Sequence, residues 1–236
     1  MWEDKMRTAQ ERRLLDDLRD ADRVYTADFE PLNRSGVEGF AVLSVDFGRR
    51  NTTEDDRLTV GIVATGLDEG LHLQHIHGFE NGQDAVTPNR RDDTDRDRFI
   101  ELLEGVPAYG EILLNLDNDR GKFPVTSERD GTIIFIETYH LPRDDDQHGS
   151  HAGDAITTFR NLDLNHLVIH GMRVPREAGE GTPGEVGTTE PRDSIAFDRD
   201  QYKEVLPVAV AEIEDASFRE ARDLIRSVLN DGFDFG

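Results

Sequence analysis

Short stretches in which apolar and polar residues alternate recur along most of the chain, separated by residues that form turns. Alternation with a period of two is typical of β-strands that bury one face, and Gly, Asn and Asp clusters mark the turns between them. The strand candidates are residues 24–29, 39–47, 57–65, 71–79, 111–116, 132–140, 165–171 and 205–213. The pattern predicts an all-β fold, a Greek-key barrel or sandwich of about eight strands.

Both ends of the chain have helical spacing instead. Leu14, Leu15 and Leu18 fall on one face of a helix over residues 2–23, and Leu224 and Ile225 do so over residues 215–229. We therefore expect three parts: an N-terminal helix (1–23), a β-domain (24–213), and a C-terminal helix with a tail (214–236). The terminal helices either cap the β-domain or pair with a partner, which would make a homo-oligomer.

Histidines cluster in two of the predicted strands. In LHLQHIHGF (residues 71–79), His75 and His77 are two apart, so a strand that buries Ile76 turns both imidazoles to the opposite face. In NHLVIHGM (165–172), His170 is likewise opposite the aliphatic side chains. Imidazole is a common ligand of copper and zinc, so the two strands predict a metal site. The alternative is a set of surface or hydrogen-bonded histidines.

Two other histidines in these strands fit the site less well. His72 is at an odd offset from His75, so a regular strand would send it to the other face. His166 shares a face with His170, but four residues of extended chain separate them by about 13 Å. We therefore do not expect His166 to reach the same ion.

These stretches carry a resemblance to a known family. TGLDEGLHLQHIHGF (65–79), LVIHG (167–171) and VLPVAVAEI (205–213) resemble strands of Cu/Zn superoxide dismutases and of the related CHRD domains. The motifs PLNRSGVEGFAVL, EGVPAYG and DGTIIFIETYHLP are similar to prokaryotic CHRD/dismutase-like proteins of unassigned function. The resemblance implies a dismutase-like barrel with copper at His75, His77 and His170. It also implies that His72 orients a ligand ring or the adjoining loop. His140, at the end of TIIFIETYH, is a further candidate ligand.

The chain departs from the dismutase pattern at two functional positions. The family has a histidine that bridges copper and zinc after the His-x-His strand, but none occurs here between His77 and His140. The family's anion-guiding arginine aligns with Pro207, and Arg173 is the nearest candidate to replace it. We therefore expect a protein that binds copper or zinc, with a redox or metal-handling role. The alternatives are a non-catalytic binding or structural domain with a structural calcium ion, and a copper-only superoxide dismutase.

Two further stretches could hold cations. HGSHAGD places His148, His151 and Asp154 three residues apart, and HAGD resembles the dismutase zinc segment; the alternative is a solvated loop. DTDRDRFIELLE (93–104) matches the calcium-binding loop of an EF-hand. The matching positions are Asp93, Asp95, Asp97, Phe99 (through its carbonyl), Glu101 and Glu104. Arg98 stands where that loop has glycine, and a positive φ there costs about 1–2 kcal/mol. The alternative is an acidic surface loop that binds no ion.

The charge and composition of the chain indicate the salt conditions, partners and location to expect for the protein. The net charge is −23, from 50 acidic and 27 basic residues, and the only lysines are Lys5, Lys122 and Lys203. Such a surface is typical of halophilic proteins, because molar salt screens its self-repulsion; the alternative is an ordinary acidic protein. No basic patch is present for nucleic acid. The chain has no cysteine, so it has neither a disulfide nor a thiolate site. Without a long apolar segment or a signal sequence, we expect a cytoplasmic protein that does not enter a membrane.

Overall fold

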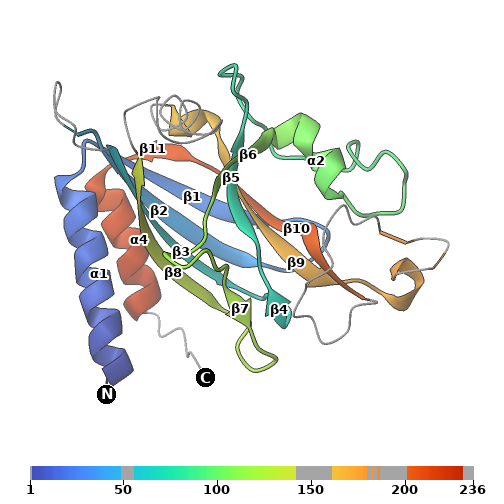
Figure 1. Cartoon of the computed structure of the whole chain (residues 1–236), viewed down its shortest axis with the longest axis horizontal. Helices are drawn as coiled ribbons and strands as arrows, with labels where there is room; N and C mark the ends of the chain where they lie inside the picture. Colours follow the sequence, from blue (N-terminus) through green and yellow to red (C-terminus); the bar gives the residue numbers. More distant parts are fainter. Residues whose placement is uncertain are drawn as a thin grey trace.

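One long antiparallel sheet, curled into a half-barrel, dominates the molecule (Figure 1). The computed structural model describes residues 2–48, 56–141, 161–179, 182, 185–186 and 201–230. The nine-stranded sheet has the order β6-β5-β9-β10-β1-β2-β3-β8, and β11 pairs with β1 beside β10. Its strands are β1 (Arg23–Pro31), β2 (Glu38–Asp46), β3 (Asp56–Thr65), β5 (Gln74–Gly78), β6 (Glu111–Asn115), β8 (Ile133–Leu141), β9 (His166–Arg173), β10 (Tyr202–Glu212) and β11 (Glu214–Ala216).

The prediction of a mostly β protein is confirmed, and the strands form where the alternation predicts them. The main difference is that the stretch 71–79 is interrupted: β4 (Gly70–Leu71) pairs with β7 (Val125–Thr126) in a separate small sheet, and β5 begins only at Gln74. His72 therefore lies in the break between two strands rather than within one.

The inner face of the sheet carries the main hydrophobic core. Leu43 of β2 lies opposite Val60 of β3, and both are fully buried there together with Ile76, Leu167 and Ile169 from the strands that carry the histidines. Strand β2 is buried on both faces. Its outward side chains are therefore also covered, by the helices.

Helices α1 (Trp2–Asp20) and α4 (Phe218–Asn230) lie side by side against the outer face of the sheet (Figure 1). Leu18 and Ile225 pack there with Phe40 and Val42 of β2. The contact of α1 with the sheet is close: a Cβ added at Gly61 of β3 would lie 2.8 Å from a methyl carbon of Leu14. The apolar stripes of the terminal helices thus cover this sheet face. Neither of them, nor any other helix of the described chain, has the length and apolar character needed to span a bilayer.

A third helix, α2 (Leu102–Tyr109), was not predicted from the sequence. At its start the Glu104 carboxylate accepts a hydrogen bond from the Glu101 backbone N–H at 3.1 Å, which satisfies one of the free amides of a first helical turn. At its end Gly110 takes a φ of 85° and its N–H donates to the Val106 carbonyl at 2.8 Å. The two glutamates three residues apart were the available sequence signal.

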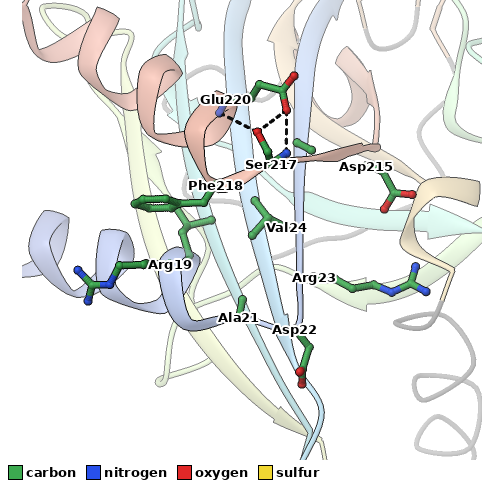
Figure 2. A pocket seen from close by; sticks show the side chains of 11 residues that line it. Arg19, Ala21, Asp22, Arg23, Val24, Asp215, Ser217, Phe218 and Glu220 are labelled. Atoms are coloured by element: carbon green, nitrogen blue, oxygen red, sulfur yellow. Dashed lines mark hydrogen bonds between the residues drawn. The ribbon is translucent and has the colours of Figure 1, made fainter.

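A shallow pocket lies where the end of α1 meets the start of α4 (Figure 2). The first amides of α4 are already satisfied, because Ser217 and Glu220 exchange hydrogen bonds: Ser217 N–H to the carboxylate at 2.8 Å and Glu220 N–H to the hydroxyl at 3.3 Å. Arg19 pairs with Asp16 and Asp20. Because these groups are already paired, we interpret this pocket as part of the packing contact between the two helices.

Candidate metal centre

Strands β5 and β9 bring His75, His77 and His170 together. They pair antiparallel, with His75 opposite Val168 and His77 opposite His166, and the His170 N–H continues the pairing to the Leu73 carbonyl at 2.8 Å. Because opposite residues of a ladder share a face, the histidines lie on the side away from the buried core. One ring nitrogen from each of the three histidines lies within 4.8 Å of the other two.

Each histidine of this group has a buried nitrogen without a hydrogen-bond partner: Nδ1 of His75, Nε2 of His77 and Nε2 of His170. The residues are 5%, 0% and 1% exposed. A buried polar atom without a partner costs about 1–3 kcal/mol, so it needs an explanation. Two nitrogens on one ion lie at most about 4.2 Å apart, given metal–nitrogen bonds of about 2.0–2.1 Å. The group therefore fits one transition-metal ion with a small adjustment of its rings.

Two peptide carbonyls fix the tautomers of two of these rings. His77 donates from Nδ1 to the Gly110 carbonyl at 3.0 Å, and His170 donates from Nδ1 to the Val205 carbonyl at 2.8 Å. A carbonyl can only accept, so in the neutral ring Nδ1 carries the proton and Nε2 keeps its lone pair. Hydrogen bonds of this kind commonly orient metal-ligating histidines.

Burial keeps the three imidazoles neutral. It lowers the pKa of His75 to about 2, that of His77 to about 3 and that of His170 to about 4. Repulsion from the neighbouring histidines lowers the pKa of His75 and His77 further. Neutral imidazole is the form that binds metals, so all three rings are in the ligating form at neutral pH.

Glycines allow the backbone to approach closely around His77. A Cβ at Gly110 would lie 2.0 Å from the Gly78 carbonyl oxygen, and a Cβ at Gly78 would lie 1.9 Å from the Asn165 side-chain oxygen. Tyr109, at the end of α2, packs edge-to-face on the His77 ring with centroids 4.6 Å apart. The glycines that follow His77 and Tyr109 therefore leave room for the close approach of the ring and its acceptor carbonyl.

His72 is buried beside the group but is not a member of it. Its Nδ1 lies 2.9 Å from the His170 carbonyl, and its Nε2 lies 2.9 Å from the Asp68 carbonyl and 3.0 Å from the Thr126 hydroxyl. Both ring nitrogens thus face the strand and loop that surround the site. The orienting role that the resemblance implies for His72 stays a prediction.

The remaining predicted histidines lie elsewhere. His140 is exposed on β8, opposite Arg57 of β3, and outside the group. His148, His151 and Asp154 lie outside the described residues. His166 was not expected to share the ion and is not in the group, but it is buried directly opposite His77 with its Nδ1 unpartnered.

The predicted calcium loop forms a second cluster. Carboxylate oxygens of Asp93, Asp95 and Asp97 lie within 4.8 Å of one another, and Asp93 Oδ1 and Asp97 Oδ2 are buried without partners. Arg98 takes the left-handed φ of 85° expected where an EF-hand has glycine. Glu104 is turned to the backbone instead: its Oε1 accepts from the Thr94 N–H at 2.7 Å.

Comparison with known proteins gives no relative. No protein-family model, no curated protein and no solved structure matches this chain. The functional argument therefore comes from the residues of the site.

Proposed function

We propose that this protein binds a copper or zinc ion at His75, His77 and His170 and uses it in metal handling or redox chemistry. The observation that carries the proposal is the convergence of three buried imidazole nitrogens that have no partner in the protein. When bound, copper would supply a one-electron couple, and zinc a Lewis acid. The protein supplies three neutral ligands on two adjacent strands, and hydrogen bonds fix the tautomers of His77 and His170.

We also propose a relationship to the dismutase and CHRD fold, with Greek-key connections. It is supported by the order of the motifs along the chain and by the curled antiparallel sheet. Pro207, at the aligned position of the guiding arginine, lies opposite His170 in the β9–β10 ladder. A proline there gives no cation to attract superoxide, so we expect weak dismutase activity or none.

Metal content and affinity test the proposal. Protein purified without chelators or nickel resin should contain copper or zinc by elemental analysis. The His75→Ala and His170→Ala variants should lose the ion, while His140→Ala, at an exposed position outside the group, should keep it. Failure of the wild-type protein to bind either metal, or equal loss in His140→Ala, would reject the site.

Superoxide decay separates metal handling from catalysis. Copper-loaded protein, freed of unbound ion, should show little activity at high salt. Decay near the diffusion limit of about 10⁹ M⁻¹s⁻¹, abolished by His75→Ala, would instead make this a copper-only dismutase.

A structural calcium ion at the acidic loop is a second candidate function. Three converging carboxylates and the left-handed Arg98 favour it, since oxygen ligands at this spacing suit a hard cation. Calcium should raise the melting temperature of the wild type, and the double variant Asp93→Asn/Asp97→Asn should lose that response. The control is Asp119→Asn, at an exposed position in another loop. An unchanged melting temperature with calcium would leave the loop as a hydrogen-bonded turn.

A further inference from the structure

We infer that the three-histidine site selects a monovalent ion, Cu⁺, over Zn²⁺ and Cu²⁺. The inference rests on the proposed function and adds the charge of the ion that the site prefers. Three features of the site carry it: the neutrality of its donors, the depth of their burial and the nature of the side chains beside them.

The donors and their supports carry no negative charge. All three ligands are neutral imidazoles, and the second nitrogens of His77 and His170 donate to peptide carbonyls rather than to carboxylates. Among the described residues, the charged groups that shift the pKa values of His75 and His77 are other histidines. By contrast, the negative charge of Asp84 raises the pKa of the nearby His166, against the larger lowering by burial. Within the described part of the chain, no carboxylate therefore joins the group of ligand atoms to balance the charge of an ion.

Burial makes this lack of compensation costly. The electrostatic cost of moving an ion from water into a medium of low dielectric rises with the square of its charge. A divalent ion therefore loses about four times as much solvation as a monovalent ion of the same size. Because the three residues are almost fully buried, the site discriminates against the second charge.

The number of donors favours the same ion. Zn²⁺ prefers four ligands and Cu²⁺ a tetragonal set, whereas Cu⁺, with a closed d-shell, is satisfied by two or three nitrogens. Two further imidazoles, those of His72 and His166, are buried near the ligands but lie outside the group, and three other neighbours of the ligands are apolar or aromatic. Phe123 lies edge-on to His75 with ring centroids 5.6 Å apart, Tyr109 packs on His77, and Val168 lies opposite His75. None of these three is a fourth donor of the carboxylate or imidazole type.

Competition titrations under anaerobic conditions test the inference. Cu⁺ would be measured against bicinchoninate, Ag⁺ would serve as a redox-inert monovalent probe, and Zn²⁺ would be measured against a chromophoric chelator. We expect Cu⁺ and Ag⁺ to bind about 100-fold or more tightly than Zn²⁺. Equal or tighter binding of Zn²⁺ would overturn the inference but leave the proposed metal site standing. Failure of every ion to bind would reject both.

A charge substitution tests the cause directly. Phe123 is partly buried beside His75, so Phe123→Glu adds a carboxylate next to the site, and Phe123→Gln is the matched neutral control. We expect the glutamate to reduce the preference for Ag⁺ over Zn²⁺ about tenfold, and the glutamine to leave it unchanged. Equal effects of the two variants, or no effect of the glutamate in protein that still folds by circular dichroism, would overturn the charge argument.

Discussion

His72 Nδ1 lies 2.9 Å from the backbone carbonyl of His170. This contact joins the break between β4 and β5 to the strand that carries the third ligand. Gly171, the next residue, makes this contact possible: it has a φ of 105°. A Cβ added there would lie 2.5 Å from the Tyr202 hydroxyl and 3.1 Å from His72 Nδ1. The site therefore depends on a glycine that is itself not a ligand.

Gly171→Ala should destabilise the fold and weaken metal binding together. The strained φ costs about 1–2 kcal/mol, and the overlap with Tyr202, Leu71 and His72 adds to it. Urea unfolding and copper titration would measure both effects. Gly36→Ala is the control, because Gly36 has a φ of 76° but nothing within 4 Å of an added Cβ. It should lose stability only, and equal loss of copper affinity in both variants would contradict the predicted role of Gly171.

Acid should destabilise the metal-free protein through its buried histidines. Their folded pKa values lie below the unfolded value of about 6.5, at about 2 for His75, about 3 for His77 and about 4 for His166 and His170. Below pH 6.5 the unfolded chain binds protons that the folded chain does not. The stabilisation is complete above that pH and is lost as the pH falls toward 4 and below.

Each of these histidines should contribute roughly 1.4 kcal/mol per pH unit to the slope below pH 6. The free energy of unfolding, measured in chelator from about pH 7 to about pH 5, gives that slope. His166→Asn should reduce it by one histidine's share, whatever its effect on stability at pH 7. An unchanged slope would show that His166 is not buried in the neutral form.

Docking of α1 should be needed for stability. Leu18 is 1% exposed and packs against the outer face of the sheet with α4. Leu18→Ala should cost about 2–5 kcal/mol, as buried leucines do. Leu103→Ala is the control, because Leu103 is 65% exposed and should cost less than about 0.5 kcal/mol. Chemical denaturation would compare the two, and similar losses would show that α1 is not anchored as described.

Salt should stabilise the protein. With a net charge of −23, self-repulsion opposes folding, and the Debye length falls to about 3 Å in 1 M salt. Calorimetry from dilute buffer to molar KCl should show a rising melting temperature. A constant or falling value would contradict the halophilic interpretation of the composition.

The histidine group was predictable because strand periodicity fixes which side chains share a face. His75 and His77 had to lie together once Ile76 was buried, and LVIHG placed His170 on the matching face of a second strand. The spacing of residues shows which side chains share a face of a strand, but it does not show where a strand is interrupted. The position of His72 between two strands could therefore not be derived. The proximity of His166 to His77 depends on the register of β5 against β9, which no local pattern encodes.

Helix α2 shows a different limit. Residues 93–104 were interpreted as a cation loop, whereas α2 begins at Leu102, inside that range, and carries Pro107, a poor helix former. The hydrogen bond from the His77 ring to the Gly110 carbonyl was likewise not predictable, because it joins residues 33 positions apart. Contacts of this kind arise from the tertiary fold rather than from local preference.

The Gly110 contact also joins the His77 ring to the last turn of α2. Gly110 ends α2 through its N–H and holds the His77 ring through its carbonyl, while Tyr109 packs on the same ring. When the last turn of α2 opens, His77 loses its acceptor and its aromatic neighbour at the same time, and the ring is free to rotate. For an ion held at the proposed site, we expect release to follow the opening of this turn, which hydrogen exchange of the Gly110 amide would measure.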